Sequence, residues 1–99
     1  MYSFLNQLNS ELIFEEFESQ SISVPTGSNL SAPNHVNIGI VIPDGYSVKS
    51  ITLISNDAAI VCTVQQIDVE RSLIGVGLFN TYNKAVSIKV KALVIFKRT

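Results

Sequence analysis

Apolar and polar residues alternate most regularly near the end of the chain, between Ala85 and Lys97. One side of this alternation is apolar throughout and consists of Val86, Ile88, Val90, Ala92, Val94 and Phe96. The other side begins with Ser87, Lys89 and Lys91 and becomes apolar at Leu93 and Ile95. Because neighbouring side chains of a strand point to opposite faces, this pattern predicts a strand whose second half is apolar on both faces. A small domain has one core, so we expect a partner subunit to cover the second apolar face.

Shorter alternating segments precede this strand, and turn-forming residues separate them. We expect strands at residues 35–42, 46–55, 59–69 and 72–79, and a weaker edge strand at residues 18–24. Pro43-Asp44-Gly45 predicts a turn, because proline presets φ and glycine accepts a positive φ. Short strands divided by turns every ~8–12 residues are typical of sandwiches and small barrels. The chain is therefore predicted to be all-β, an antiparallel, jelly-roll-like β-sandwich of about six to eight strands.

The N-terminal segment has a different spacing. Leu5, Leu8 and Leu12 lie three and four residues apart, and Glu15 interrupts the next step. This pattern predicts either a short amphipathic helix or the extended entry to a strand. An isolated helix of about 12–15 residues is marginal in water, so a helix here would have to dock on the domain or bundle with copies of itself. We expect residues 1–16 to form an attachment and oligomerisation segment and residues 17–99 to form the sandwich domain.

Charged residues are few and unevenly distributed. The 99 residues are 46% hydrophobic and 15% charged, whereas a typical domain is ~25% charged. This low charge indicates association, although an apolar monomer covered by Ser, Thr and Asn is the alternative.

The formal net charge is −1, but residues 1–48 contain acidic side chains and no Lys or Arg, and residues 49–99 hold every Lys and Arg. Such asymmetry can mark a basic ligand-binding half. The simpler interpretation places the acidic segment beside the lysine-bearing last strand, in one subunit or between two.

Residues that could carry chemistry are scarce. His35 is the only histidine and Cys62 the only cysteine, which excludes a Cys/His metal cluster and an intrachain disulfide. Cys62 lies in an apolar strand, where a buried thiol is the ordinary role. Glu15, Glu16 and Glu18 are better explained as a solvated charge run than as a catalytic pair, and no Gly-x-Ser-x-Gly nucleophile motif is present. We expect a protein that is not an enzyme and that needs neither a cofactor nor a metal.

The loop Asn80-Thr81-Tyr82-Asn83 is the best candidate for a ligand-binding surface. An exposed tyrosine flanked by amides can stack on a sugar and bind its hydroxyl groups, although a polar turn with a tyrosine lid over the core is the alternative. The lysines of the last strand indicate a water-facing edge, so nucleic-acid binding is not expected. We find neither a signal peptide nor an apolar run long enough to cross a membrane, and we expect no membrane association.

Two segments of the chain carry a resemblance to a known group of proteins. They are I-P-D-G-Y-S-V-K-S-I-T at Ile42–Thr52 and S-I-K-V-K-A-L-V-I-F-K at Ser87–Lys97. From Val41 to Lys97 the chain resembles small C-terminal domains of bacteriophage virion proteins, namely fibres, receptor-binding tips and head decorations. The resemblance implies a β-sandwich that assembles as a homotrimer without a cofactor and contacts other virion proteins. Residues 1–24 are too few for a fibre shaft, so a short spike, a fibre tip or a capsid decoration is implied.

These observations support one leading hypothesis and two alternatives. We expect a non-enzymatic virion structural protein, made in the host cytoplasm and located in the virion. Its trimer interface is expected to consist of Leu5, Leu8, Leu12, Leu93 and Ile95, because a three-fold axis would cover the last strand and bundle the leucine stripes. The first alternative is a module that binds a carbohydrate or host receptor, such as a host-surface glycan, through Asn80, Thr81, Tyr82 and Asn83. The second is a small inhibitor that binds a host protein.

Overall fold

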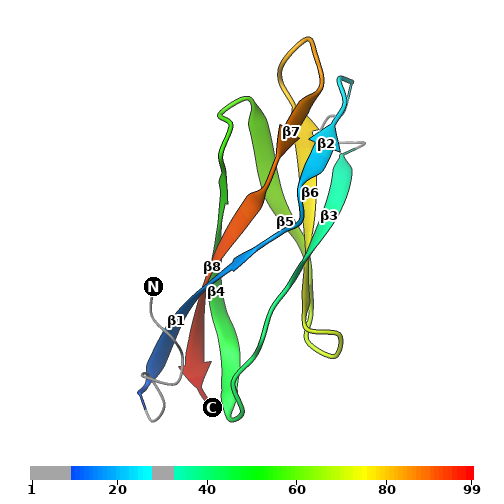
Figure 1. The fold of residues 1–99 in the computed structure, drawn as a ribbon. Helices are drawn as coiled ribbons and strands as arrows, with labels where there is room; N and C mark the ends of the chain where they lie inside the picture. Colours follow the sequence, from blue (N-terminus) through cyan, green and yellow to red (C-terminus); the bar gives the residue numbers. More distant parts are fainter. Residues whose placement is uncertain (1–9, 28–32) are drawn as a thin grey trace.

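The computed structural model describes residues 10–27 and 33–99, which form an all-β structure (Figure 1). The strands are β1 (Leu12–Glu18), β2 (Ile22–Val24), β3 (Asn34–Gly39), β4 (Tyr46–Ser55), β5 (Ile60–Asp68), β6 (Leu73–Asn80), β7 (Val86–Ile88) and β8 (Val90–Arg98). All strand pairs are antiparallel, and the described residues contain no helix. The predicted all-β antiparallel sandwich is therefore confirmed.

Two three-stranded sheets form the layers of the sandwich. Sheet 1 has the strand order β1-β8-β4, and sheet 2 has the order β3-β6-β5. The short pair β2-β7 extends the β1-β8 pair toward the other end of the molecule (Figure 1). The pairing is nested, because the first segment pairs with the last and β3 pairs with β6, as in the jelly-roll-like arrangement that we expected. The resulting body is narrow and elongated, with principal extents of 48 × 25 × 16 Å.

Ser19 links the two parts of the long first-to-last strand pair. The β1-β8 register ends with Glu18 opposite Lys91, and the β2-β7 register resumes with Ile22 opposite Ile88. Between them, the Ser19 amide donates to the Val90 carbonyl at 2.8 Å, and the Val90 amide donates to Ser19 Oγ at 2.9 Å. The hydroxyl thus replaces a backbone acceptor where the ladder is interrupted. The buried serine lets one strand pair run past an irregularity without losing its hydrogen bonds.

The core lies between the inner faces of β8 and β6. The inward residues, which are almost completely inaccessible to solvent, are Val90, Ala92, Val94 and Phe96 on β8 and Ile74, Val76 and Leu78 on β6. The Phe17 ring meets the Phe96 ring edge to face, with centroids 6.3 Å apart, in a favourable aromatic geometry. The apolar side assigned to the last strand from its alternation is therefore the inner face of sheet 1.

β1 is a strand in the region where the leucine spacing also allowed a helix. It begins at Leu12 and pairs along its whole length with β8. The helical alternative is therefore wrong from Leu12 onward, because the alternating inward and outward positions of β1 match the pleat of its partner. The expected domain boundary between residues 16 and 17 falls inside this strand. Leu5 and Leu8 lie outside the described residues.

Glu15 interrupts the apolar inner face of β1. Its register opposite Val94 turns the side chain toward the core side of sheet 1. Its Oε2 atom is shielded from solvent and has no hydrogen-bond partner within the described residues. A solvated charge run therefore describes Glu16 and Glu18, which face outward, but not Glu15. A shielded carboxylate oxygen without a donor destabilises the folded state.

Replacing Glu15 with leucine is expected to raise the free energy of unfolding by about 1 kcal/mol, because the change removes the unsatisfied oxygen and completes an apolar face. Urea unfolding of the Glu15→Leu variant measures this difference. Glu16→Leu is the matched control, since Glu16 faces outward, and its effect should stay within about 0.5 kcal/mol. A Glu15→Leu protein that is less stable than the parent would contradict the prediction.

Candidate functional site

The outer face of sheet 1 has an apolar centre. Cross-strand register places Phe14 beside Ile95, and Leu93 between Glu16 and Thr52. The side chains of Phe14 and Leu93 are 50% and 38% exposed, and Ile95 is half-buried. A hollow of about 350 Å³ on this face is lined by Phe14, Glu15, Glu16, Thr52, Leu93, Val94 and Ile95. The second apolar side of the last strand is therefore a surface in this chain, and Phe14 extends it.

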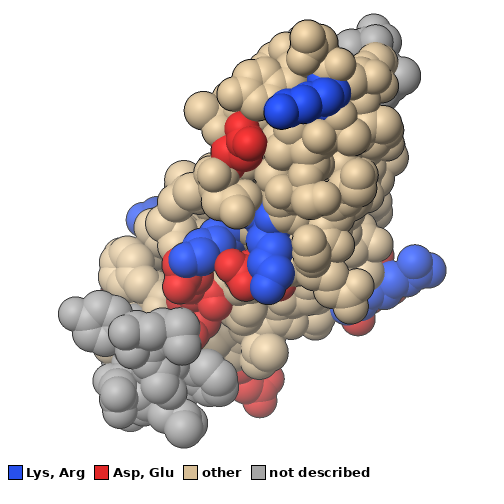
Figure 2. Space-filling view, turned by 45° about the horizontal axis from the view of Figure 1, so that its top comes forward, with Lys and Arg blue, Asp and Glu red and all other residues tan. Residues whose placement is uncertain are grey.

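Two ion pairs border this apolar centre. Lys91 Nζ lies 3.7 Å from Glu16 Oε1, and Lys89 Nζ lies 3.9 Å from Glu18 Oε1. Lys91 lies on β8 and Lys89 at the junction of β7 and β8, and both are paired with β1, so the acidic segment lies beside the lysine-bearing end of the chain as expected. Exposed pairs of this kind contribute at most about 1 kcal/mol, so they mark a hydrated rim more than they stabilise the fold. Figure 2 shows one cluster of mixed basic and acidic side chains, further charged side chains near the top, right and bottom of the view, and large uncharged areas between them.

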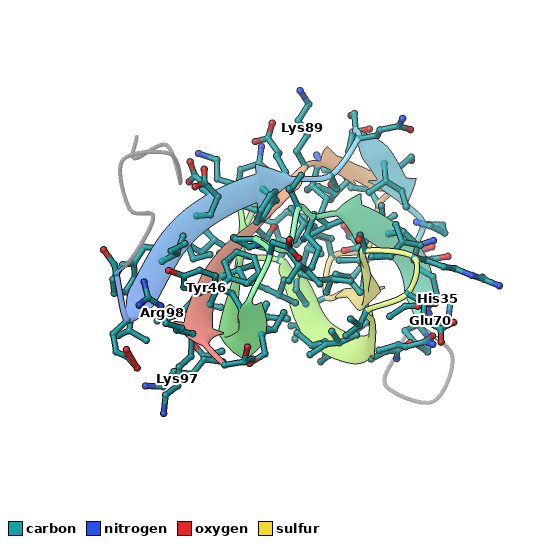
Figure 3. The ribbon with its side chains drawn as sticks, turned by 90° about the horizontal axis from the view of Figure 1, so that it is seen from below. His35, Tyr46, Glu70, Lys89, Lys97 and Arg98 are labelled. Atoms are coloured by element: carbon teal, nitrogen blue, oxygen red, sulfur yellow. The ribbon has the colours of Figure 1, made fainter. Side chains whose placement is uncertain are left out.

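Tyr46 and Arg98 fasten one end of sheet 1 (Figure 3). Tyr46 Oη donates a hydrogen bond of 2.6 Å to the Ser10 carbonyl, and Arg98 Nη2 donates one of 3.3 Å to Tyr46 Oη. The Arg98 guanidinium also lies 5.8 Å from the centre of the Tyr46 ring, within the range of a cation–π contact. The start of β4 and the end of β8 are thereby tied to the segment that leads into β1. Tyr46, which also packs against the core, therefore has a structural role at this end of sheet 1.

The preceding turn has the geometry that its residues predicted. The Tyr46 amide donates to the Pro43 carbonyl at 3.1 Å, and Gly45 has φ of +81°. The Thr99 amide and hydroxyl both donate to the Gly45 carbonyl, each at 2.9 Å. The I-P-D-G-Y segment is therefore a turn whose Gly45 carbonyl also accepts hydrogen bonds from Thr99.

The expected ligand-binding loop divides into a structural half and an exposed half. Asn80 is buried, and its Nδ2 donates to the carbonyls of Val24 and Lys84 at 3.0 and 2.8 Å, while its Oδ1 accepts from the Tyr82 amide at 2.7 Å. The Thr81 amide and hydroxyl both donate to the Ala59 carbonyl. Asn80 and Thr81 therefore hold the loop in place. Tyr82 and Asn83 are exposed, so the tyrosine is not a lid over the core.

The two single chemistry-bearing residues lie apart on sheet 2. Cys62 is half-buried on β5 opposite Leu78, and burial raises the pKa of its thiol, which keeps the thiol protonated at neutral pH. His35 is exposed on β3 opposite Gly77. Within residues 10–27 and 33–99, no three His, Cys, Asp or Glu side chains are placed to share a metal ion. The same ranges contain no helix that could span a membrane.

Several surface residues did not emerge from the pattern of the sequence. Phe14 was hidden by the helical interpretation of its segment, although a strand interpretation would have placed it beside Ile95. Leu12 does lie on the same outer face, opposite Lys97 at the end of β8. Val64 and Ile67 belong to the strand that we expected at residues 59–69, and both are substantially exposed. Their exposure depends on how the two sheets diverge, which no local pattern records.

Comparisons with known proteins give no relative. No family model matches the chain, no curated protein matches it, and no solved structure matches its fold. Functional inference therefore depends on the surfaces and contacts of the chain itself.

Replacing Asn80 with alanine is expected to lower the free energy of unfolding by about 2–3 kcal/mol, because the buried Val24 carbonyl, the partly buried Lys84 carbonyl and the Tyr82 amide lose their partner. Chemical unfolding followed by circular dichroism measures the loss. Asn83→Ala, in the exposed half of the same loop, is the control and should change stability by less than about 0.5 kcal/mol. Equal effects of the two substitutions would show that Asn80 does not organise the loop.

Proposed function

We propose that this protein is a non-enzymatic structural subunit of a bacteriophage virion that assembles as a homotrimer through the outer face of sheet 1. The observation that carries the association is the exposed apolar centre formed by Phe14, Leu93 and Ile95 on a hydrogen-bonded sheet. The virion assignment is supported by the resemblance of residues 42–52 and 87–97 to phage virion domains. The role is that of a short spike, a fibre tip or a capsid decoration.

The distribution of charge on this face suits association. An interface of moderate strength has an apolar centre and a hydrated polar rim. Here the two outward-facing carboxylates of β1, Glu16 and Glu18, are already paired with lysines beside the apolar centre, so covering that centre desolvates no unpaired carboxylate on the outer face of β1. Full burial of an exposed Phe or Leu contributes roughly 1.5–3 kcal/mol, so the half-exposed Phe14 and Leu93 would each supply about 1 kcal/mol. Repetition at every interface of a ring would then make the assembly stable.

The elongated shape suits a subunit that is attached at one end and exposed at the other. The start of β1 and the end of β8 lie at one end of the long axis (Figure 1). The loop between β6 and β7 and the turn between β4 and β5 lie toward the opposite end (Figure 1). Association along sheet 1 would leave these loops free, which is the geometry expected of a tip or decoration subunit.

Replacing Leu93 with glutamate is expected to reduce the molar mass in solution from three chains to one, because the change puts a charge in the apolar centre of the interface. Light scattering on a sizing column measures the mass against the 10.8 kDa chain. Ile95→Glu is a second variant with the same expected result.

Val41→Glu is the matched control for both variants. Val41 is exposed and lies in the connection between β3 and β4, outside sheet 1, so its replacement should leave the trimer intact. Circular dichroism of each variant verifies that the fold is retained. A parent protein that is monomeric, or a folded Leu93→Glu protein with unchanged mass, would overturn the proposal.

A further inference from the structure

The second half of the inner face of β5 is open to solvent along one flank of the sandwich. Val64 is paired with Val76 and Ile67 with Ile74, so their side chains point to the core side of sheet 2. Val76 and Ile74 are completely buried, yet Val64 is 40% and Ile67 44% exposed. Val69, in the turn after β5, is 63% exposed. We call Val64, Ile67 and Val69 the β5 flank.

The β5 flank is open because the two sheets separate there. β4 and β5 share the turn at residues 56–59 and diverge as they leave it (Figure 1). Sheet 1 ends at β4, so no strand of this sheet lies over the far half of β5. Residues that a wider sheet would bury are therefore left partly in water. Exposed apolar positions on a core-facing side are a stronger indication of a partner than scattered apolar residues on an outer face.

The strands that border this flank are shaped for side-chain packing rather than for strand addition. The β5-β6 register shifts between Val64 and Gln66, and the β4-β8 register shifts between Val48 and Ser50. Such bulges interrupt the regular row of donors and acceptors that an added strand would need. The β5 flank therefore offers an apolar surface, and its occupant must be another surface and not an extended peptide.

Charges beside the two apolar surfaces are complementary. Near the β5 flank, Asp68 is paired with Arg71 at 3.7 Å, whereas Glu70 is exposed and belongs to no ion pair in the described part of the chain. On the outer face of sheet 1, Lys97 is exposed next to Ile95 and Phe14, and it likewise belongs to no described ion pair. An acidic group thus accompanies one patch and a basic group accompanies the other, which favours contact between them.

We infer that the β5 flank of one copy packs against the outer face of sheet 1 of the next copy. This inference rests on the proposed function, because it supplies the counter-surface for the Phe14 and Leu93 centre. A two-fold dimer buries the same patch of both copies, whereas a closed ring joins two different patches of each copy. The described residues present two different patches, the β5 flank and the outer face of sheet 1, and the ring arrangement covers both. The occupant of the β5 flank is therefore a second copy of this chain.

The test compares variants in which a glutamate substitution disrupts one of the two patches at a time. Val69→Glu is chosen for the β5 flank because Val69 is the most exposed of its residues, so the substitution should not disturb folding. Leu93→Glu disrupts the apolar centre on the outer face of sheet 1, and Val41→Glu is the control. Each purified variant, with folding verified by circular dichroism, is measured by light scattering alone and in an equimolar mixture over increasing concentration.

We expect the Leu93→Glu and Val69→Glu variants each to be a monomer alone, and their equimolar mixture to form a dimer of twice the chain mass. In the mixture, the intact β5 flank of a Leu93→Glu chain binds the intact outer face of sheet 1 of a Val69→Glu chain. The ring cannot close, because the remaining surface of each chain carries the glutamate. If Val69→Glu remains a trimer while Leu93→Glu dissociates, the inference is overturned and the proposed association through sheet 1 stands. If both dissociate and the mixture stays monomeric, the pairing of these two patches is overturned. A trimeric Leu93→Glu overturns the proposed function itself.

Discussion

The position of β8 in the middle of sheet 1 is the constraint on which the rest of the structure depends. This last strand pairs with β1 on one side and with β4 on the other, and its inner face supplies Val90, Ala92, Val94 and Phe96 to the core. Sheet 1 cannot form before β8 is in place, because β1 and β4 do not pair with each other. The nested order also makes most pairings distant in sequence, which is typical of slowly folding β-proteins. The hydrogen bonds of Ser19, Tyr46 and Thr99 reinforce this arrangement by holding other segments to the two ends of β8 or to the turn beside it.

The two faces of β8 explain both the stability and the surface chemistry of the molecule. Its inner face is uniformly apolar, so the burial of these side chains fixes which face of the strand points into the core. Its outer face changes from lysine to leucine and isoleucine along the strand, and β1 changes with it, from Glu18 and Glu16 to Phe14. Opposite charges at one end and apolar side chains in the middle therefore meet across the same ladder, and Lys97 follows at the far end. The outer face is consequently an apolar patch with a paired, hydrated border, rather than a mixed surface.

Much of this fold could be predicted from sequence because its strands are regular and its turns carry specific residues. The alternation of residues 85–97 identified the buried face correctly, and Pro43 to Gly45 predicted a turn whose glycine has the required positive φ. The uneven charge predicted that β1 and β8 lie together. Local patterns did not predict the inward direction of Glu15, because a polar residue at an inner position breaks the alternation. They also missed the role of Asn80, because one of its partners, Val24, lies 56 positions away in the sequence.

The surfaces were harder to predict than the core for a physical reason. Burial of a core residue follows from its own strand, since a fully apolar side must face inward. Exposure of Val64 and Ile67 follows instead from the width of the opposite sheet and from the divergence of β4 and β5. A sandwich with three strands in each sheet and a least extent of 16 Å has few side chains with which to cover its flanks. In the proposed ring, the face of the next copy takes the place of the strand that sheet 1 lacks over β5. Assembly would then bury core-facing side chains that each subunit leaves exposed on its own. The low charge of the chain would follow, because surfaces that are covered in the assembly need few charged residues.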